Sequence, residues 1–152
     1  MSWLVRWIME KVKNNAPRKA NMSKSKPTTA ASLVWFEVPA DDLERAKKFS
    51  RTLSGWKIAP FPGMQNPGAQ NYLHIDTGGG NDTPDGGMML RQHPQQPITQ
   101  YVGVESVTKS AAKVEQVGGK ICVARTAVPQ MGCFAVCPDT EGKTFALWEM
   151  SK

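Results

Sequence analysis

The chain of 152 residues carries a formal net charge of +6, and its length suits one domain with its own core or two small halves that share one. No apolar stretch is long enough to span a bilayer. Residues 1–30 hold seven basic residues and one acidic residue. This segment therefore carries all of the excess positive charge, and the rest of the chain is formally neutral. Nucleic-acid binding would require a basic stripe on the folded part of the chain. The sequence shows none, and we expect no nucleic-acid partner.

The start of the chain divides into an apolar segment and a polar one. Residues 1–13, MSWLVRWIMEKVK, place apolar side chains at helical spacing, whereas residues 14–32 are polar and basic and lack a period, as in a linker. Arg6 interrupts the apolar run, which argues against a secretory signal. Two interpretations remain, a dispensable leader before a second start at Met22 and a short amphipathic helix on a membrane surface. We favour the leader.

The three cysteines, Cys122, Cys133 and Cys137, are odd in number and lack CxxC spacing, which argues against a disulfide framework. Cys133 and Cys137 stand four residues apart in a predicted strand, which separates their Cα atoms by about 13 Å. That distance is too long for a disulfide bond. We therefore expect buried thiols and a reducing, cytoplasmic location.

From residue 33 the pattern predicts alternating strands and helices. The β-rich run LVWFEV predicts a strand over 33–38 that ends at Pro39. A helix is predicted over 41–53, with Asp41 or Asp42 as its N-cap and Gly55 as its stop. Its apolar stripe, expected to face inward, is Leu43, Ala46, Phe49 and Leu53. Further strands are predicted over 56–61, 71–77 and 87–92, the last two joined by a glycine-rich hairpin loop over 78–87.

The second half of the chain repeats this order. A strand over 99–106 precedes a helix over 107–119, and strands over 120–126, 132–138 and 143–150 follow. The helix is expected to turn Val107, Ala111, Val114 and Val117 inward. The helix exits LSGWKI and QVGGKI also match. The sequence thus predicts an α+β domain over 31–152 built from two βαβββ modules, at about 33–93 and 98–150. Each sheet has a second face that needs cover, and two such faces can cup around a shared cavity.

The body of the chain resembles the vicinal oxygen chelate superfamily, which includes glyoxalase I, bleomycin-resistance proteins and extradiol dioxygenases. The fragments that carry the resemblance are VWFEVPADDLERAKKF, LSGWKI, YVGVESV, VGGKI and PDTEGKTFALWEM. Their order and spacing cover residues 33–150, and the WFE first strand is most similar to a glyoxalase-related branch. The resemblance implies a cupped, partly closed mixed sheet, often in a homodimer, with the active site inside the cup.

The resemblance also implies where a divalent metal would bind. Metal enzymes of the superfamily hold the ion with His, Glu or Gln at one place on the first and last strand of each module. The matching places here are occupied by Leu33, Met89, Tyr101 and Ala146. These side chains are poor ligands for a divalent ion, so we expect no metal cofactor. Of the two histidines, His93 is expected in an exposed loop and His74 on a strand as a satisfied or half-exposed imidazole.

Strand alternation predicts which side chains share the face of the ligand places. The expected ligand-binding residues on that face are Trp35, Glu37, Met89, Arg91, Tyr101 and Trp148. Such a wall is apolar and aromatic with a few charges, as small-molecule sites are. Arg91 is suited to a carboxylate, and Glu37 to accepting hydrogen bonds or acting as a base. In the alternative, the aromatic side chains fill the cup, and Arg91 and Glu37 pair with each other or reach solvent.

These observations favour a metal-independent protein that binds a small, partly aromatic or amphipathic molecule. One alternative is a metal-dependent lyase or isomerase similar to lactoylglutathione lyase, with shifted ligands such as His74, Glu37 and Glu149. Another is a non-catalytic interaction protein. Glu149 stands three residues after Ala146 on the last strand. Because three is odd, we expect its side chain on the face opposite the ligand place.

Overall fold

The structure, a computed structural model, describes residues 31–60, 71–128 and 131–151. The two interpretations of the start of the chain lie outside these residues. The chain divides into two compact units. The first module runs from Trp35 to Ile98, and the second comprises Thr99–Lys152 together with the start of the first strand up to Val34. Among the described residues, no helix is long and apolar enough to cross a membrane.

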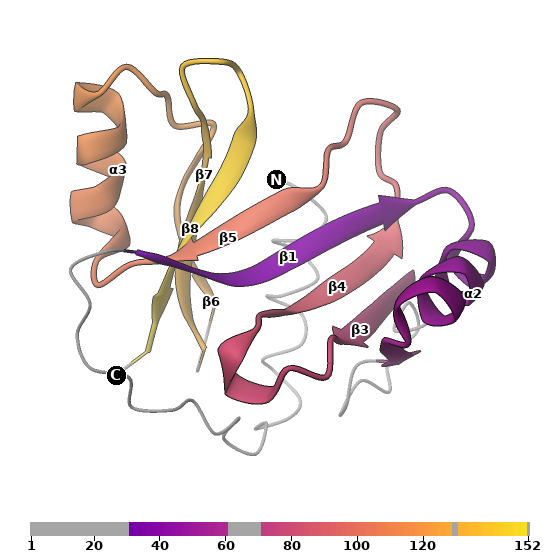
Figure 1. The fold of residues 1–152 in the computed structure, drawn as a ribbon. Coiled ribbons are helices and arrows are strands. Elements are labelled where there is room, and N and C mark those ends of the chain that lie inside the picture. Colours follow the sequence, from indigo (N-terminus) through magenta and orange to yellow (C-terminus); the bar gives the residue numbers. More distant parts are fainter. Residues whose placement is uncertain (1–30, 61–70, 129–130, 152) are drawn as a thin grey trace. The chain divides into compact units, whose positions relative to one another are not determined.

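The first module has the predicted βαβββ order (Figure 1). Its elements are β1 (Ser32–Ala40), α2 (Leu43–Ser54), β2 (Lys57–Pro60), β3 (Tyr72–Asp76), the short 3₁₀ turn η2 (Gly80–Asp82) and β4 (Asp85–Leu90). The strands lie in the order β2-β3-β4-β1. β1 and β4 are parallel, while β3 pairs antiparallel with both β2 and β4. The sheet of this module is therefore mixed, and β3 and β4 form the predicted hairpin.

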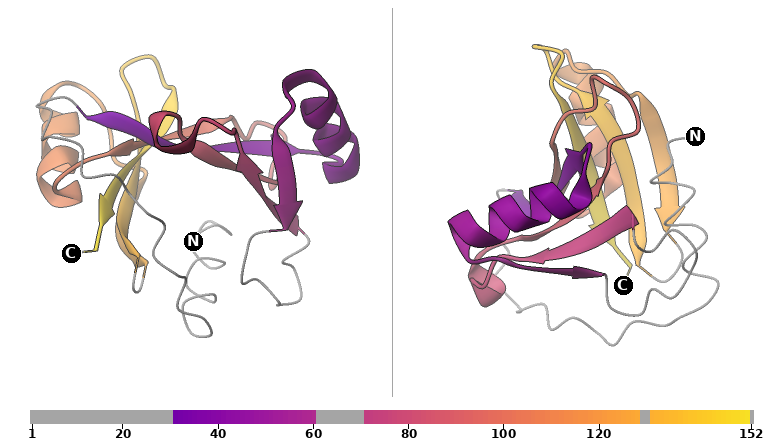
Figure 2. Two further views of the ribbon diagram at one scale, coloured as in Figure 1. Left: turned by 60° about the horizontal axis from the view of Figure 1, so that its bottom comes forward. Right: turned by 90° about the vertical axis from the view of Figure 1, so that its right-hand side faces the viewer.

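Helix α2 begins and ends at predicted residues. The Asp42 side chain accepts a hydrogen bond of 2.9 Å from the Arg45 backbone N–H, which satisfies one of the unpaired donors of the first turn. Gly55 ends the helix with φ at 70°, a left-handed conformation that glycine adopts without strain. Helix α2 lies beside the strands of its module (Figure 2). Leu43 and Ala46 pack against the core residues Ala40, Ile58, Leu73, Ile75 and Met88.

The predicted inward stripe of α2 is wrong in its second half. Phe49 is 67% exposed and Leu53 is 72% exposed. The helical period shows that these residues share a flank of the helix. It does not show how far the surface beneath the helix extends, and burial depends on that surface.

Two strand ends also differ from the prediction. β1 continues through Pro39 to Ala40 and pairs with β4 over its whole second half. The Ala40 carbonyl accepts from the Arg91 N–H at 2.9 Å, so the preceding residue directs its backbone nitrogen away from β4 and Pro39 removes no bond of that ladder. β4 begins at Asp85, so Gly86 and Gly87 belong to the strand and not to the loop.

The second module repeats the βαβββ order (Figure 1). Its elements are β5 (Thr99–Gly103), α3 (Val107–Gln116), β6 (Val123–Val128), β7 (Gly132–Pro138) and β8 (Thr144–Met150). The strand order is β5-β8-β7-β6, with β5 and β8 parallel and the other pairs antiparallel. Ser106 caps α3 by accepting from the Lys109 N–H at 3.3 Å. Each module is thus a mixed sheet with one helix, and the predicted α+β class is confirmed.

Both faces of the second sheet pack apolar side chains. On the α3 side lie Val107, Cys133, Ala135, Cys137 and Leu147. On the other side, Val128 and Phe134 pack with Val123, Val136 and Trp148. Two predictions are wrong here. Val117, expected inside, is 66% exposed because α3 ends at Gln116 and Val117 is its C-cap. Cys122 is exposed, although all three thiols are free as predicted.

Candidate functional site

The face of the first sheet that points away from α2 carries the candidate site. Phe36 and Val38 of β1 pack into the core beneath α2, so the alternating residues Trp35 and Glu37 lie on the opposite face, as predicted. Register places further side chains beside them on β4 and β3. The α2-distal face, as we name it, comprises Trp35, Glu37, Tyr72, His74, Asp85 and Met89.

A chain of hydrogen bonds connects three of these side chains. The Tyr72 hydroxyl donates to Glu37 Oε1 at 2.9 Å, and Trp35 Nε1–H donates to the Tyr72 oxygen at 3.2 Å. Tyr72 is 2% exposed and Glu37 is 5% exposed. A hydrogen bond between two buried side chains is costly to break. The phenol therefore holds the carboxylate of Glu37 and the indole of Trp35 in a fixed relation.

Gly87 provides the space that Tyr72 needs. Gly87 lies on β4, between β3, which carries Tyr72, and β1, which carries Glu37. In the strand register it stands opposite Glu37 of β1 and His74 of β3. A Cβ built on Gly87 would overlap the Tyr72 oxygen and come within 2.8 Å of its ring carbon Cε1. The phenol can therefore cross β4 to reach Glu37 only because residue 87 has no side chain.

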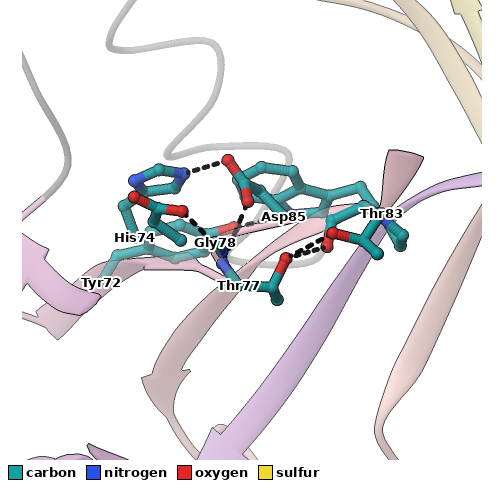
Figure 3. Close-up of polar contacts among 9 residues, drawn as sticks. Tyr72, His74, Thr77, Gly78, Thr83 and Asp85 are labelled. Atoms are coloured by element: carbon teal, nitrogen blue, oxygen red, sulfur yellow. Dashed lines mark hydrogen bonds and ion pairs between the residues drawn. The ribbon is translucent and has the colours of Figure 1, made fainter. Parts of the chain in front are cut away.

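His74 forms the second part of the site (Figure 3). Its Nε2 lies 3.1 Å from Asp85 Oδ2, and its ring stacks on Trp35 with centroids 5.8 Å apart and planes 10° apart. The side chains of His74 and Asp85 are 24% and 38% exposed, so this part of the face reaches solvent. The prediction of a half-exposed, hydrogen-bonded imidazole at His74 is confirmed.

The β3–β4 connection fixes the position of Asp85 (Figure 3). Asp85 Oδ1 accepts from the Thr77 N–H at 3.2 Å. The Thr77 hydroxyl in turn lies 3.0 Å from that of Thr83 and donates to the Pro84 carbonyl at 3.1 Å. Asp85 thereby uses one oxygen for the loop and the other for His74. A carboxylate held at both oxygens orients the imidazole ring.

Arg91 and Met89 have different surroundings. Met89 is 1% exposed and lies opposite Tyr72 in register. Arg91 follows the end of β4, where its Nε–H donates to Asp41 Oδ1 and its Nη1 donates to the Gln96 carbonyl, both at 2.8 Å. A shallow hollow of about 560 Å³ at this end is lined by Asp41, Arg91, Gln92, His93 and Pro94. Arg91 thus organises the linker after β4, and His93 is exposed as predicted.

In the second module, Tyr101 and Trp148 lie on the face opposite α3. Tyr101 is 4% exposed and pairs in register with Ala146. Trp148 is half-buried and packs against the cluster of Val128 and Phe134. Their shared face agrees with the predicted alternation, whereas their role as ligand-binding residues stays a prediction.

Glu149 lies on the α3 side of β8, as its odd spacing from Ala146 predicted. Its Oε2 accepts from the Val107 N–H at the start of α3 at 2.8 Å and from Cys133 Sγ at 3.5 Å. Burial raises the pKa of the Cys133 thiol, and the hydrogen bond and charge of Glu149 raise that pKa further. Glu149 therefore supports the first turn of a helix, where a negative charge is favourable.

Within the described ranges, no group of three His, Cys, Asp or Glu side chains is arranged to hold a metal ion. The four places that the resemblance assigns to metal ligands differ in exposure. Leu33 is 43% exposed, whereas Met89, Tyr101 and Ala146 are buried.

Sequence reasoning missed Tyr72, Asp85 and Gly87. Tyr72 and His74 alternate on one predicted strand, and this alternation is the signal that places them on one face. Asp85 lacked such a signal because it stood in a segment interpreted as loop.

Comparison with known proteins agrees with this architecture. Residues 32–68 match the family model described as bleomycin resistance protein-like N-terminal. A glyoxalase/bleomycin resistance protein/dioxygenase superfamily member from Vibrio splendidus superposes with a TM-score of 0.54 at 12% identity, over 80% of this chain and all of the other. This likeness shows that the chain has the fold of that superfamily member. Methylmalonyl-CoA epimerase from Mycobacterium tuberculosis, with a TM-score of 0.53 at 11% identity over 88% of this chain and 95% of its own, shares the same fold.

Two curated relatives of this chain are named as a glyoxylase and a glyoxylase-like domain-containing protein. A Mycobacterium bovis protein is 28% identical over 118 residues, which are 76% of this chain and 43% of that protein. This chain therefore spans less than half the length of the mycobacterial relative. A glyoxylase-like domain-containing protein from Didymella fabae is 29% identical over 115 residues, which are 74% of this chain and 88% of its own.

Proposed function

We propose that this chain is a member of the vicinal oxygen chelate superfamily, and that it binds a small, partly aromatic or amphipathic molecule on the α2-distal face of its first module, without the divalent metal of the superfamily's metal enzymes. The observation that carries the proposal is the connected set of aromatic and acidic side chains on that face. Trp35 donates to Tyr72, Tyr72 donates to Glu37, and His74 both stacks on Trp35 and bonds to Asp85.

The chemistry of this set suits recognition of a flat or amphipathic molecule. Trp35 and His74 are half-buried, so each combines a packed position with some surface that solvent reaches. Aromatic rings offer large apolar faces at a low cost in conformational entropy. Because hydrogen bonds fix Trp35, His74 and Asp85 before a ligand arrives, binding does not have to order them.

A metal-dependent lyase or isomerase with His74, Glu37 and Glu149 as ligands has weaker support. Glu149 accepts a hydrogen bond from the first turn of α3, and a charged acceptor of this kind contributes about 1.5–3 kcal/mol. A metal bound through Glu149 would have to outweigh that contribution. Elemental analysis of protein purified without chelator tests this alternative, because a bound metal in stoichiometric amount would favour it over metal-free binding.

Thermal-shift screening with small aromatic and amphipathic compounds tests the proposal. A compound present at about a hundred times its dissociation constant stabilises the folded protein by about 2.7 kcal/mol. We expect Trp35→Leu to abolish the shift produced by any hit. Trp56→Leu is the matched control, since Trp56 packs on the α2 side of the same sheet, and it should retain the shift. A broad screen without a single stabilising compound would refute the proposed function.

A further inference from the structure

The side of α2 that points away from the sheet combines apolar and basic side chains. Phe49 is 67% exposed and Leu53 is 72% exposed, and their spacing of four positions makes them neighbours on the helix. Arg45 precedes Phe49 by the same spacing. It begins a row of exposed basic side chains that continues at Lys48 and Arg51, each three positions further along. The outer face of α2, as we name it, comprises these five residues.

The outer face of α2 carries an excess of positive charge. Two basic residues of the helix, Arg45 and Lys47, have acidic partners three positions away. Lys48 and Arg51 form no ion pair with any residue that the structure describes. The segments outside the described residues hold one acidic residue, Glu10, against eight basic ones. Wherever these segments lie, they cannot neutralise both Lys48 and Arg51.

From this combination we infer that the outer face of α2 docks on an anionic lipid surface. Each basic residue close to such a surface strengthens binding by about fivefold. Exposed apolar side chains of an amphipathic helix enter the boundary between head groups and acyl chains. A bilayer adapts to side chains that protrude, whereas a protein partner must offer them a preformed groove. The inference goes beyond the proposed function, which concerns the opposite face of the sheet.

Other occupants fit the outer face of α2 less well. A second copy of the chain would bring the same positive charge to the contact, and like charges repel each other. Residues 1–30 also carry excess positive charge, so the same repulsion applies to them. Nucleic acid would match the basic residues, but its phosphates offer nothing to the apolar side chain of Leu53. A lipid surface matches both the charged and the apolar residues.

Co-sedimentation of the full chain with vesicles tests the inference. Vesicles of phosphatidylcholine with about 30% phosphatidylserine are compared with vesicles of phosphatidylcholine alone, at about 100 mM salt. We expect the chain to pellet with the anionic vesicles and to stay largely in solution with the neutral ones. Residues 1–30 are present in every variant, so their own contribution to pelleting cancels when variants are compared.

Removal of charge at two helices locates the contact. Lys48→Gln combined with Arg51→Gln should lower the partition coefficient for anionic vesicles by about tenfold. Lys109→Gln combined with Lys113→Gln is the matched control, because it removes two exposed lysines from α3 and changes the net charge equally. The control should retain most of the binding. All four side chains belong to exposed or partly exposed helix positions, so urea unfolding should show nearly unchanged stability.

Removal of apolar surface tests for insertion. Phe49→Ser combined with Leu53→Ser keeps every charge of α2 and should lower the same partition coefficient by about tenfold. Val117→Ser is the control, since Val117 is 66% exposed at the C-cap of α3, and it should leave vesicle binding unchanged.

Three outcomes would overturn the inference. Equal pelleting with neutral and anionic vesicles, or none with either, would favour an acidic protein surface as the partner. An equal loss from the charge pairs of α2 and α3 would show that net charge alone explains adsorption. Full binding by the variant with Phe49→Ser and Leu53→Ser would show that the apolar side chains do not enter the bilayer. None of these results bears on ligand binding at the α2-distal face.

Discussion

Substitution of Gly87 by alanine tests whether the Tyr72–Glu37 hydrogen bond depends on the missing side chain between the two strands. A Cβ at residue 87 would overlap the phenol oxygen of Tyr72, and the backbone of β4 is held by neighbours on both sides. We therefore expect the Tyr72 ring to be displaced and its bond to Glu37 to break. The α2 side of the sheet should remain packed, because the new methyl group points away from it.

The magnitude follows from three contributions. Overpacking typically costs about 1–3 kcal/mol, and loss of a hydrogen bond to a buried carboxylate costs about 1.5–3 kcal/mol. Replacing glycine by alanine within a strand returns about 0.5–1 kcal/mol of backbone entropy. We expect Gly87→Ala to lower the free energy of unfolding by about 3 kcal/mol in total.

A double-mutant cycle measured by urea unfolding isolates the cause. When Tyr72 is already leucine or alanine, the added methyl group meets no phenol, and Gly87→Ala should then be close to neutral or slightly stabilising. The expected coupling energy between the two positions is about 3 kcal/mol. An equal cost of Gly87→Ala in both backgrounds would show that the phenol is not what residue 87 accommodates, and would refute the reasoning.

Three further predictions concern single contacts. Tyr72→Phe should lower the free energy of unfolding by about 1–3 kcal/mol, because it removes the donor to buried Glu37; urea unfolding at an unchanged midpoint would contradict this. Glu149→Ala should cost a similar amount by removing the acceptor at the start of α3, whereas Glu141→Ala in the exposed turn before β8 should change stability by less than about 0.5 kcal/mol. Burial raises the pKa of Cys137 to about 11 from 9.0. Since the unfolded chain then releases this proton first, stability should fall as pH rises from 9 toward 11, and Cys137→Ala should flatten that decline in alkaline unfolding curves.

Features decided by local sequence were predictable. The helix ends at Asp42 and Gly55 follow from the chemistry of those two residues. β7 occupies the predicted residues 132–138, because a strand between a glycine and a proline has clear boundaries. The face assignment of Trp35, Glu37 and Glu149 followed from alternation alone.

Features that depend on distant partners were not predictable. Asp85 reaches His74 only because β3 and β4 pair in a particular register, and the glycines around it suggested a loop. Arg91 follows the last residue of β4, where alternation no longer determines direction, and it turns to Asp41, fifty positions away in the sequence. Phe49 and Leu53 have the period of buried residues, yet the described structure leaves them exposed.

The two glutamates that the sequence offered as metal ligands have different tasks in the fold, and the difference is measurable. Glu149 supports α3 from the neighbouring strand, so Glu149→Gln should change the free energy of unfolding and leave ligand affinity unchanged. Glu37 lies on the α2-distal face, and Glu37→Gln keeps an oxygen that accepts from Tyr72 while removing a charge. Under the proposed function, Glu37→Gln should change ligand affinity, because Glu37 belongs to the connected side chains of that face. If both substitutions changed only stability, Glu37 would be a structural group and would not belong to the proposed binding site.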